Sequence, residues 1–245
     1  LSSAASDVYK RQMNYYMSAG YLDDQGIVPN SGFQRYSARL KADYQVKPWL
    51  KMGGNVSFTH YDSREQDTES STSNANAFYA ANIMGAIYPM YIRDAAGNIM
   101  SDNRGFLRYD YGSDTNFRRQ NVIPNANPLA SYMLDKMKYS GDVISGKWFA
   151  DIDIWGGIKA KINIGVDANN VRYTNMTNPF YGQYSETSGV GGLISVATER
   201  SFSTNQQYLL TYNKTFNDVH NLDVLAGHEN YNYKYQYLYL SLIHI

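Results

Sequence analysis

Residues 35–58 read RYSARLKADYQVKPWLKMGGNVSF, and their first half alternates between apolar and polar side chains without a slip. Tyr36, Leu40 and Tyr44 fall on one side of this alternation, whereas Arg35 and Arg39 fall on the other. A period of two is typical of an extended strand with one apolar and one polar face. The stretch therefore predicts a long β-strand, from Phe33 to Val46, whose two faces meet different surroundings.

A second strand follows almost at once. Residues 50–61 alternate in the same way, and only Lys47, Pro48 and Trp49 separate them from the first strand. So short a connection predicts a tight hairpin, in which Pro48 takes a turn position where its missing N–H does no harm. The same pattern predicts five further strands, at residues 14–21, 147–155, 158–169, 206–215 and 221–231. Gly156 and Gly157 fit a hairpin turn that needs positive φ.

The connections between these seven strands alternate in length. They run long, short, very long, short, long and short along the chain, so every tight turn is expected at one end of the strands. Transmembrane β-barrels have this arrangement, with short periplasmic turns and long extracellular loops. Strands of roughly 9 to 11 residues are enough to cross a bilayer when tilted. We therefore expect an all-β fold, an antiparallel transmembrane β-barrel segment, with the apolar face toward lipid and the polar face toward a wet lumen.

The apolar face carries the side chains that this interpretation assigns to lipid, and aromatic residues lie toward several strand ends, as in interfacial girdles. The residues predicted to face lipid are Tyr36, Leu40, Tyr44, Val56, Phe58, Trp148, Ile152, Ile162 and Ile164. A soluble β-sandwich also alternates, but its strands are usually about 5 or 6 residues long and its loop lengths are not segregated. Seven strands cannot close a barrel with an even strand number, so the chain is expected to be part of a larger barrel.

The two ends of the chain do not continue the neighbouring patterns. Residues 1–12 and 240–245 resemble translated adapter sequence, so we expect them to be non-native and expect residues 13–239 to be a partial barrel. Composition excludes other classes: 22 basic and 22 acidic residues give no field that recruits nucleic acid, and cysteine is absent. No apolar run approaches the roughly 20 residues of a membrane-spanning helix. Aromatic residues make up 15% of the chain, and 24 of its residues are Tyr, which favours strands.

Several segments, taken in order and spacing, resemble the barrel region of SusC/RagA-type TonB-dependent outer-membrane transporters. The segments are YYMSAGYLDDQGIV, RYSARLKADYQVKPWLKMGGNVSFTH, YPMYIRDAAGN, YDYG, NPLAS, WFADIDIWGGIKAKINIGVD, NPFYG and YNKTFNDVHNLDVLAGHENY. The resemblance implies a 22-stranded barrel in the outer membrane of a Gram-negative cell, with a plug and a TonB box upstream of this chain. It also implies TonB and a SusD-like surface lipoprotein as partners, and energy-coupled import of oligosaccharides or, in some members, peptides.

The sequence offers no catalytic signature, and we expect neither an enzyme nor a cofactor or metal. The four His show no metal-ligand spacing, and no nucleophile-elbow, zinc-protease or phosphate-loop motif is present. Asp151 and Asp153 are two residues apart, as paired catalytic carboxylates can be, but lumen-facing strand positions have the same spacing. Residues 94–98, DAAGN, carry oxygen ligands without the spacing of an EF-hand, so a turn is the better interpretation.

Substrate binding is expected in the longest loop, where aromatic faces and polar side chains suited to sugars occur together. The candidate substrate-binding residues are Tyr88, Tyr91, Arg108, Tyr109, Asp110, Tyr111, Arg118 and Arg119. The alternative is that these tyrosines pack the loop against itself or against the lipoprotein. At the level of function, a passive outer-membrane porin, an outer-membrane enzyme and a soluble glycan-binding β module remain alternatives to the transporter.

Overall fold

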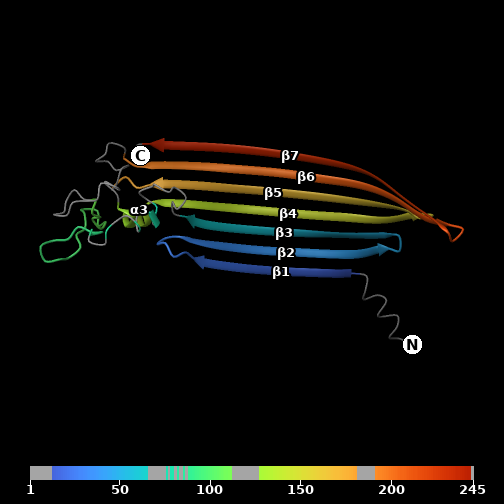
Figure 1. Ribbon diagram of the computed structural model, residues 1–245, viewed down its shortest axis with the longest axis horizontal. Coiled ribbons are helices and arrows are strands. Elements are labelled where there is room, and N and C mark those ends of the chain that lie inside the picture. The colour runs from blue at the N-terminus through green and yellow to red at the C-terminus, as the bar shows by residue number, and fades with distance from the viewer. Residues whose placement is uncertain are drawn as a thin grey trace, which may run out of the picture.

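The computed structural model describes residues 13–65, 88–111, 127–180 and 191–243, together with a few single positions between 76 and 85. These residues form one seven-stranded antiparallel sheet in which each strand pairs with its neighbours in the sequence (Figure 1). The strands are β1 (Met13–Gln25), β2 (Gly32–Lys47), β3 (Leu50–Glu65), β4 (Lys136–Trp155), β5 (Ile158–Thr177), β6 (Leu193–Phe216) and β7 (His220–Ile243). One helix, α3 (Pro128–Leu134), lies beside the sheet. The predicted all-β antiparallel fold is confirmed, and the sheet is not closed.

The strand connections separate by length, as predicted. Residues 48–49, 156–157 and 217–219 form the turns at one end of the sheet, which we call the turn end. Residues 26–31, 66–135 and 178–192 connect the strands at the opposite end, the loop end (Figure 1). Gly156 and Gly157 have φ values of 61° and 91°, the positive-φ conformation that the hairpin prediction required.

The strands are longer at the loop end than the alternation predicted. β5 continues to Thr177 and β6 begins at Leu193, so much of the segment between the predicted strands at residues 158–169 and 206–215 is paired strand. β1 likewise extends to Gln25, which reduces the first loop to residues 26–31. Backbone pairing continues where the alternation of side chains stops. Residues 240–243 continue β7, and their non-native origin stays a prediction.

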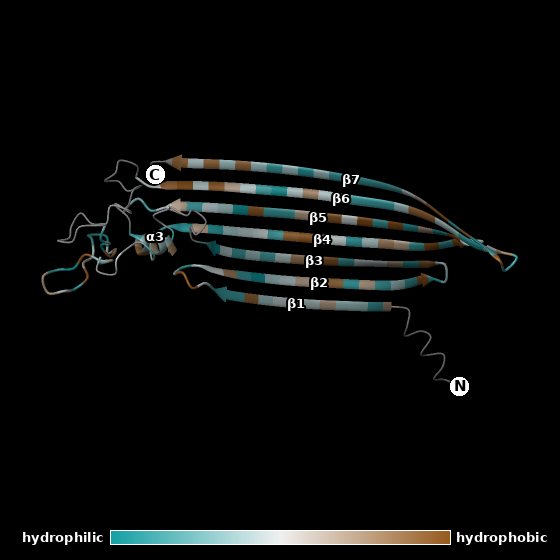
Figure 2. Cartoon of the chain, viewed as in Figure 1, coloured by the Kyte–Doolittle hydropathy of each residue, from teal (hydrophilic) through white to brown (hydrophobic). Residues whose placement is uncertain are grey.

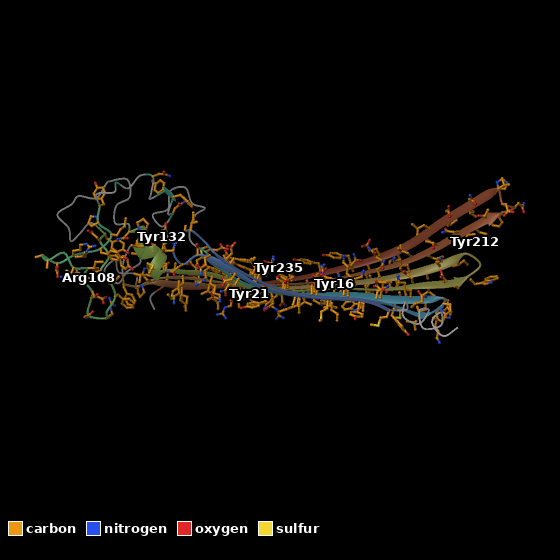
Figure 3. All side chains as sticks on the ribbon, turned by 90° about the horizontal axis from the view of Figure 1, so that it is seen from below. Tyr16, Tyr21, Arg108, Tyr132, Tyr212 and Tyr235 are labelled. Carbon is orange, nitrogen blue, oxygen red and sulfur yellow. The ribbon has the colours of Figure 1, made fainter. Side chains whose placement is uncertain are left out.

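The sheet is a single layer. The described strands all belong to it, so the second sheet that a β-sandwich requires does not occur among them. Large apolar side chains remain exposed along the strands, among them Tyr36, Leu40 and Trp148. The buried apolar residues gather instead at the loop end: Ile92, Tyr109, Ala130, Tyr132 and Ala197. Figure 3 shows α3 and Tyr132 lying over one side of the sheet at that end.

Candidate functional site

The register of the strands gives the sheet two distinct faces. Residues paired across neighbouring strands share a face. Tyr36 is opposite Tyr21 and His60, Leu40 is opposite Val56, and the register assigns positions on every other strand to the same side of the sheet. We call it the apolar face and the other the polar face. Figure 2 shows the brown and teal bands that alternate along the strands.

The nine side chains predicted to face lipid all lie on the apolar face. The pairs that connect them are Leu40↔Val56, Tyr44↔Met52, Phe58↔Ile144, Leu50↔Ile152, Trp148↔Ile164 and Ala150↔Ile162. The structure therefore places them on one surface, although residues far apart in the sequence contribute to it. Their orientation toward lipid stays a prediction.

β6 and β7 interrupt the apolar face. Gln206, His228 and Asn230 lie on it, at the level of Ile162 and Ile164 on β5. In the half of β7 nearer the loop end, the tyrosines lie on the polar face instead. They are Tyr231, Tyr233, Tyr235, Tyr237 and Tyr239. The continuous apolar surface thus extends from β1 to β5.

The polar face is lined with charged pairs that cross between strands. Lys161 Nζ lies 3.5 Å from Asp151 Oδ1, and Lys159 Nζ lies 3.0 Å from Asp153 Oδ1. Because each carboxylate has its own lysine, the two aspartates do not form the paired carboxylates of an acid–base site. These pairs are exposed, and exposed ion pairs typically contribute about 0 to 1 kcal/mol. They make this face charged.

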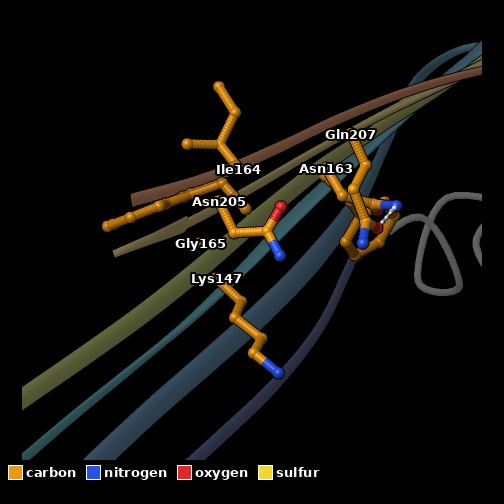
Figure 4. A pocket seen from close by; sticks show the side chains of 8 residues that line it. Lys147, Asn163, Ile164, Gly165, Asn205 and Gln207 are labelled. Atoms are coloured by element: carbon orange, nitrogen blue, oxygen red, sulfur yellow. Dashed lines mark hydrogen bonds between the residues drawn. The ribbon is translucent and has the colours of Figure 1, made fainter. Parts of the chain in front are cut away.

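A pocket of about 330 Å³ opens between β4, β5 and β6 (Figure 4). On the polar face it is lined by Lys147, Phe149, Asn163, Asn205 and Gln207, and Gly165 leaves space because it has no side chain. Asn163 Nδ2 donates to Gln207 Oε1 at 3.4 Å, the bond drawn dashed in Figure 4. Amides, a cation and an aromatic ring are the groups that bind hydroxylated or peptidic ligands.

These pocket residues are absent from the sequence-based candidates. The alternation placed Lys147, Asn163 and Gln207 on the polar face, but it did not show which polar positions surround a gap. A glycine at a polar-face position, Gly165, is the one sequence signal that could have found the pocket.

The Gln207 amide continues into a second group of polar side chains. Gln207 Nε2 donates to Glu229 Oε1 at 3.2 Å, and Asn205 Nδ2 donates to the same oxygen at 2.8 Å. The pocket thus borders a carboxylate on β7 that two amides hold in place.

The loop between β3 and β4 contains a repeat of eight residues. Asp94, Asp102 and Asp110 recur at that interval, and the first two begin identical turns closed by Gly97 and Gly105. Asp94 Oδ1 accepts from the backbone N–H groups of Ala96 and Asn98 at 2.9 Å each. Asp102 Oδ1 accepts from those of Arg104 and Phe106 at 2.9 and 3.0 Å. The prediction of a turn at DAAGN is confirmed.

Backbone hydrogen bonds join the three repeats in a ring. The N–H of Ile92 donates to Arg108 O, that of Arg108 to Met100 O, and that of Met100 to Ile92 O, each at 2.9 Å. The side chain and backbone of Asn98 lower the pKa of Asp94, because they donate hydrogen bonds to its carboxylate. Residues 88–111 therefore form an ordered unit, which we call the loop unit.

Six of the eight predicted substrate-binding residues lie in this unit, and Arg118 and Arg119 lie outside the described residues. The rings of Tyr91 and Tyr109 are 5.2 Å apart at an angle of 35°. Tyr109 and Asp110 are buried, at 5% and 0% exposure, whereas Tyr88, Tyr91, Arg108 and Tyr111 are half-buried. Burial raises the pKa of Tyr109. The half-buried residues are the ones within reach of a ligand in this arrangement.

Asn127 joins the loop unit to α3. Its Oδ1 accepts from Ala130 N at 3.1 Å, as an N-cap does, and its Nδ2 donates to the backbone oxygens of Met90 and Asp110 at 2.7 and 2.9 Å. At the other end of α3, Asp135 Oδ1 accepts from the backbone and the side chain of Asn178 at 2.9 and 2.6 Å. Burial raises the pKa of Asp135, and these two hydrogen bonds oppose that shift.

No group of three or more His, Asp or Glu is placed to hold a metal ion in the described part of the chain. No helix in it is long and apolar enough to span a bilayer.

No protein-family model matches the chain. TonB-dependent receptor P39 of Formosa agariphila is 24% identical over 216 residues, which is 87% of this chain and 18% of the relative. TonB-dependent receptor P3 of the same organism is 24% identical over 220 residues, 87% of this chain and 19% of the relative. The chain thus spans about a fifth of the length of the curated relatives that it matches.

Solved structures of other proteins share the fold of this chain. The RagAB peptide importer in the open-open state matches with a TM-score of 0.72 at 23% identity, over 95% of this chain and 24% of that chain. A structure of the RagAB peptide transporter matches with a TM-score of 0.69 at 22% identity, over 96% and 24%. The resemblance to SusC/RagA-type TonB-dependent receptors that the motifs indicated is confirmed, and so is the barrel-type strand arrangement.

Proposed function

We propose that this chain, a relative of TonB-dependent receptors, forms part of the barrel wall of an outer-membrane active transporter that imports oligosaccharides or peptides. One observation carries the proposal: a single antiparallel sheet with all its tight turns at one end, an apolar face and a charged face. A sheet with no covering layer must find another apolar environment for its exposed face, and lipid is that environment.

The strand lengths support a membrane position. β4 and β5 have 20 residues each and β6 and β7 have 24, about twice the roughly 9 to 11 residues that cross a bilayer. The excess lies at the loop end, where the apolar face carries polar and charged side chains on β3, β4 and β5. The strands therefore extend past the membrane on the extracellular side, and the loop unit lies above them.

The polar face lines the lumen in this proposal. Its pocket at Gly165 and the half-buried Tyr88, Tyr91, Arg108 and Tyr111 offer aromatic surface, amides and cations. This mixture suits hydroxyl groups and apolar sugar faces, and equally peptide groups and side chains. The RagAB structures are described as a peptide transporter and a peptide importer, which supports import as the direction of transport.

The partners follow from the family resemblance. A SusD-like surface lipoprotein covers the extracellular mouth, where the loop unit lies, and TonB supplies energy through a plug and TonB box in the part of the protein that precedes this chain. Both partners belong to the whole transporter rather than to these strands.

Deletion of the complete gene tests the function. Cells that lack it should lose uptake of one class of labelled substrate, oligosaccharides or peptides, and the complete gene should restore that uptake. Uptake should also stop when TonB is removed or an uncoupler collapses the proton gradient. Uptake that continues without TonB would instead identify a passive porin, and unchanged uptake of both substrate classes would refute the proposal.

Two neighbouring glutamines test the lumen assignment. Gln207 lines the pocket on the polar face, whereas Gln206 lies on the apolar face of the same strand. Gln207→Ala in the complete transporter should raise the KM for uptake by roughly five- to tenfold, because about 1 to 1.5 kcal/mol of hydrogen bonding is lost. Gln206→Ala serves as the matched control and should leave KM unchanged. Equal effects of the two substitutions would contradict the assignment of the faces.

A further inference from the structure

A row of exposed cations crosses the apolar face near the loop end, with one member on each strand from β3 to β7. They are Arg64, Lys138, Arg172, Arg200 and Lys234, and we call them the cation line. Lys136 lies on the same face two residues closer to the loop end of β4, and Leu238, Leu240 and Leu242 lie beyond the row on β7. The proposed function assigns no role to the cation line.

The cation line slants across the sheet in a regular way. Arg64 and Lys138 are direct partners. On each following strand, the cation lies two residues closer to the turn end than the residue that pairs with the previous cation. Arg172, for example, lies two residues closer to the turn end than Thr174, the partner of Lys138. The pairs that define these steps are Arg64↔Lys138, Lys138↔Thr174, Arg172↔Thr198 and Arg200↔Gln236. From β3 to β7 the line therefore descends by six residues.

The positions of the tight turns shift along the strands in the same direction as the cation line. Leu50 at the first turn is opposite Ile152, and β4 continues three residues further to Trp155. Ile158 at the second turn is opposite Tyr212, and β6 continues four residues further to Phe216. From β3 to β7 the turns shift by seven residues along the strand direction, and the cation line shifts by six residues in the same direction.

Strand tilt explains the common slant. Strands about 4.8 Å apart, tilted by about 35–45°, are staggered by roughly 1 to 1.5 residues per strand along any line parallel to the membrane. The cation line, with six residues over four strand-to-strand steps, is at the upper end of this range, and the turns, with seven, lie slightly above it. Each line is therefore close to level in the membrane plane. The turns mark the periplasmic level, and the cation line marks a second level above it.

The distance between the two levels matches a bilayer. Arg64, Arg172 and Lys234 are each fourteen residues from the first residue of their strands. Fourteen residues rise about 46 Å along a strand and, at that tilt, about 33 to 38 Å along the membrane normal. The hydrocarbon core is about 30 Å thick, and the headgroups bring the bilayer to about 40 to 45 Å. With the turns at one headgroup region, the cation line lies in the other.

Two carboxylates on the apolar face lie near the cation line, and one of them pairs with Lys138 of the line itself. Asp62 Oδ1 lies 3.0 Å from Lys138 Nζ, and Asp142 Oδ1 lies 2.8 Å from His60 Nδ1. The described residues provide no ion pair to Arg172 or Arg200. Guanidinium groups bind phosphate oxygens in a bidentate way, so these two arginines suit a phosphate ligand.

We propose that the cation line binds the phosphate groups of lipids in the outer leaflet of the outer membrane. The binding rests on the proposed function, because it requires the apolar face to contact lipid. The acyl chains lie against the apolar face below, and the phosphates meet the arginines above. The ligand is a lipid phosphate rather than a free phosphate ion, because the continuous apolar surface of β3 to β5, beneath Arg64, Lys138 and Arg172, accommodates the chains that carry it.

The test uses the complete purified transporter and three probes: lipid A with its phosphates, the same lipid dephosphorylated, and inorganic phosphate. Native mass spectrometry measures the lipid bound to the wild type, to R172Q/R200Q, and to R35Q/R39Q as a matched control. Arg35 and Arg39 are exposed arginines on the polar face of β2, so the control removes the same charge from the opposite side.

The double variant R172Q/R200Q should bind phosphorylated lipid A about tenfold more weakly than the wild type, and the control should stay within about twofold. The dephosphorylated lipid should bind all three proteins with equal, weaker affinity. Equal binding of both lipids by the wild type, an equal loss in the control, or binding of inorganic phosphate alone at these arginines would each overturn the inference.

A lipid-quenching measurement at Ile162 in the same samples separates this inference from the proposed function. If Ile162 contacts lipid while the cation line shows no phosphate preference, only the inference fails. If Ile162 is exposed to water instead, the membrane assignment fails with it.

Discussion

At the scale of single residues, Gly157 shows how one backbone position holds the β4–β5 hairpin against β6. Its φ is 91°, and a Cβ added there would meet the carbonyl oxygen of Asn213, whose own N–H donates to Gly157 O at 3.0 Å. Gly156 has a φ of 61° and open space around it. A methyl group added at Gly157 should therefore lower the free energy of unfolding more than one added at Gly156.

Gly157→Ala should lower the free energy of unfolding of the complete barrel protein by about 2 to 3 kcal/mol, because strain and a clash with backbone add together. Gly156→Ala should cost only about 1 kcal/mol, the penalty for a non-glycine residue in the left-handed region. Urea unfolding in lipid measures both values. A Gly157→Ala protein as stable as Gly156→Ala would contradict the described contact with β6.

Asp135 gives a pH dependence at the loop end. Burial raises its pKa, so the protonated form is favoured in the folded state. Stability from such a group is fully present below the unfolded pKa and is lost as the pH rises through the folded pKa. Asp135→Asn keeps the oxygen that accepts both hydrogen bonds from Asn178 but removes the charge.

Hydrogen exchange, corrected for intrinsic rates, measures this effect on the amides of residues 131–135. As the pH rises from about 4 to 7, the wild type should lose protection relative to Asp135→Asn. A difference between the two proteins that stays constant over this range would show that the Asp135 carboxyl has no raised pKa.

At the scale of elements, α3 and the loop unit depend on one side chain. Asn127 is 1% exposed, caps α3 with its oxygen and holds two loop carbonyls with its nitrogen. Asn127→Asp keeps the cap but replaces both donors with a charge that faces two carbonyl oxygens.

This substitution should destabilise the loop unit locally by about 3 kcal/mol or more, because buried acceptors lose their donors and a charge is buried. Limited proteolysis should then cleave residues 88–111 faster. Asn103→Asp, at an exposed position of the second turn, is the control and should leave the cleavage rate unchanged. Equal rates for all three proteins would contradict the role of Asn127.

The sequence predicted the strand segments that lipid is expected to cover. It did not predict the strand segments whose two faces are both expected to meet water. Residues 158–169 alternate because their two faces differ, and β5 was predicted there. Residues 170–177 do not alternate, yet they pair with β4 and β6 through partners such as Asp142 and Arg200. Pairing between strands, which a single segment does not reveal, sets the true strand ends.

The candidate site was predictable in part for a related reason. Alternation identified the polar face that contains the pocket, but the pocket depends on which residues of three strands surround Gly165. The loop candidates were chosen by composition, which does not distinguish the buried Tyr109 and Asp110 from the half-buried Tyr91 and Arg108. The eight-residue repeat of Asp94, Asp102 and Asp110 was visible in the sequence, but a search for period two overlooks it.

In the whole molecule, the apolar face of this single-layer sheet is expected to contact lipid and its polar face to line a lumen. Ile162 and Lys161 are adjacent on β5 and lie on opposite faces, in the continuous part of the apolar surface. The Ile162→Arg substitution should destabilise the inserted barrel by about 2 to 4 kcal/mol near the bilayer midplane.

Fluorescent labels at these two positions of the complete protein, reconstituted in bilayers, test this expectation most directly. A label at residue 162 should be quenched by quenchers carried on lipid chains and protected from aqueous ones, and a label at residue 161 should show the reverse. Equal access of aqueous quenchers to both labels would contradict the membrane position of the sheet, and with it the transporter.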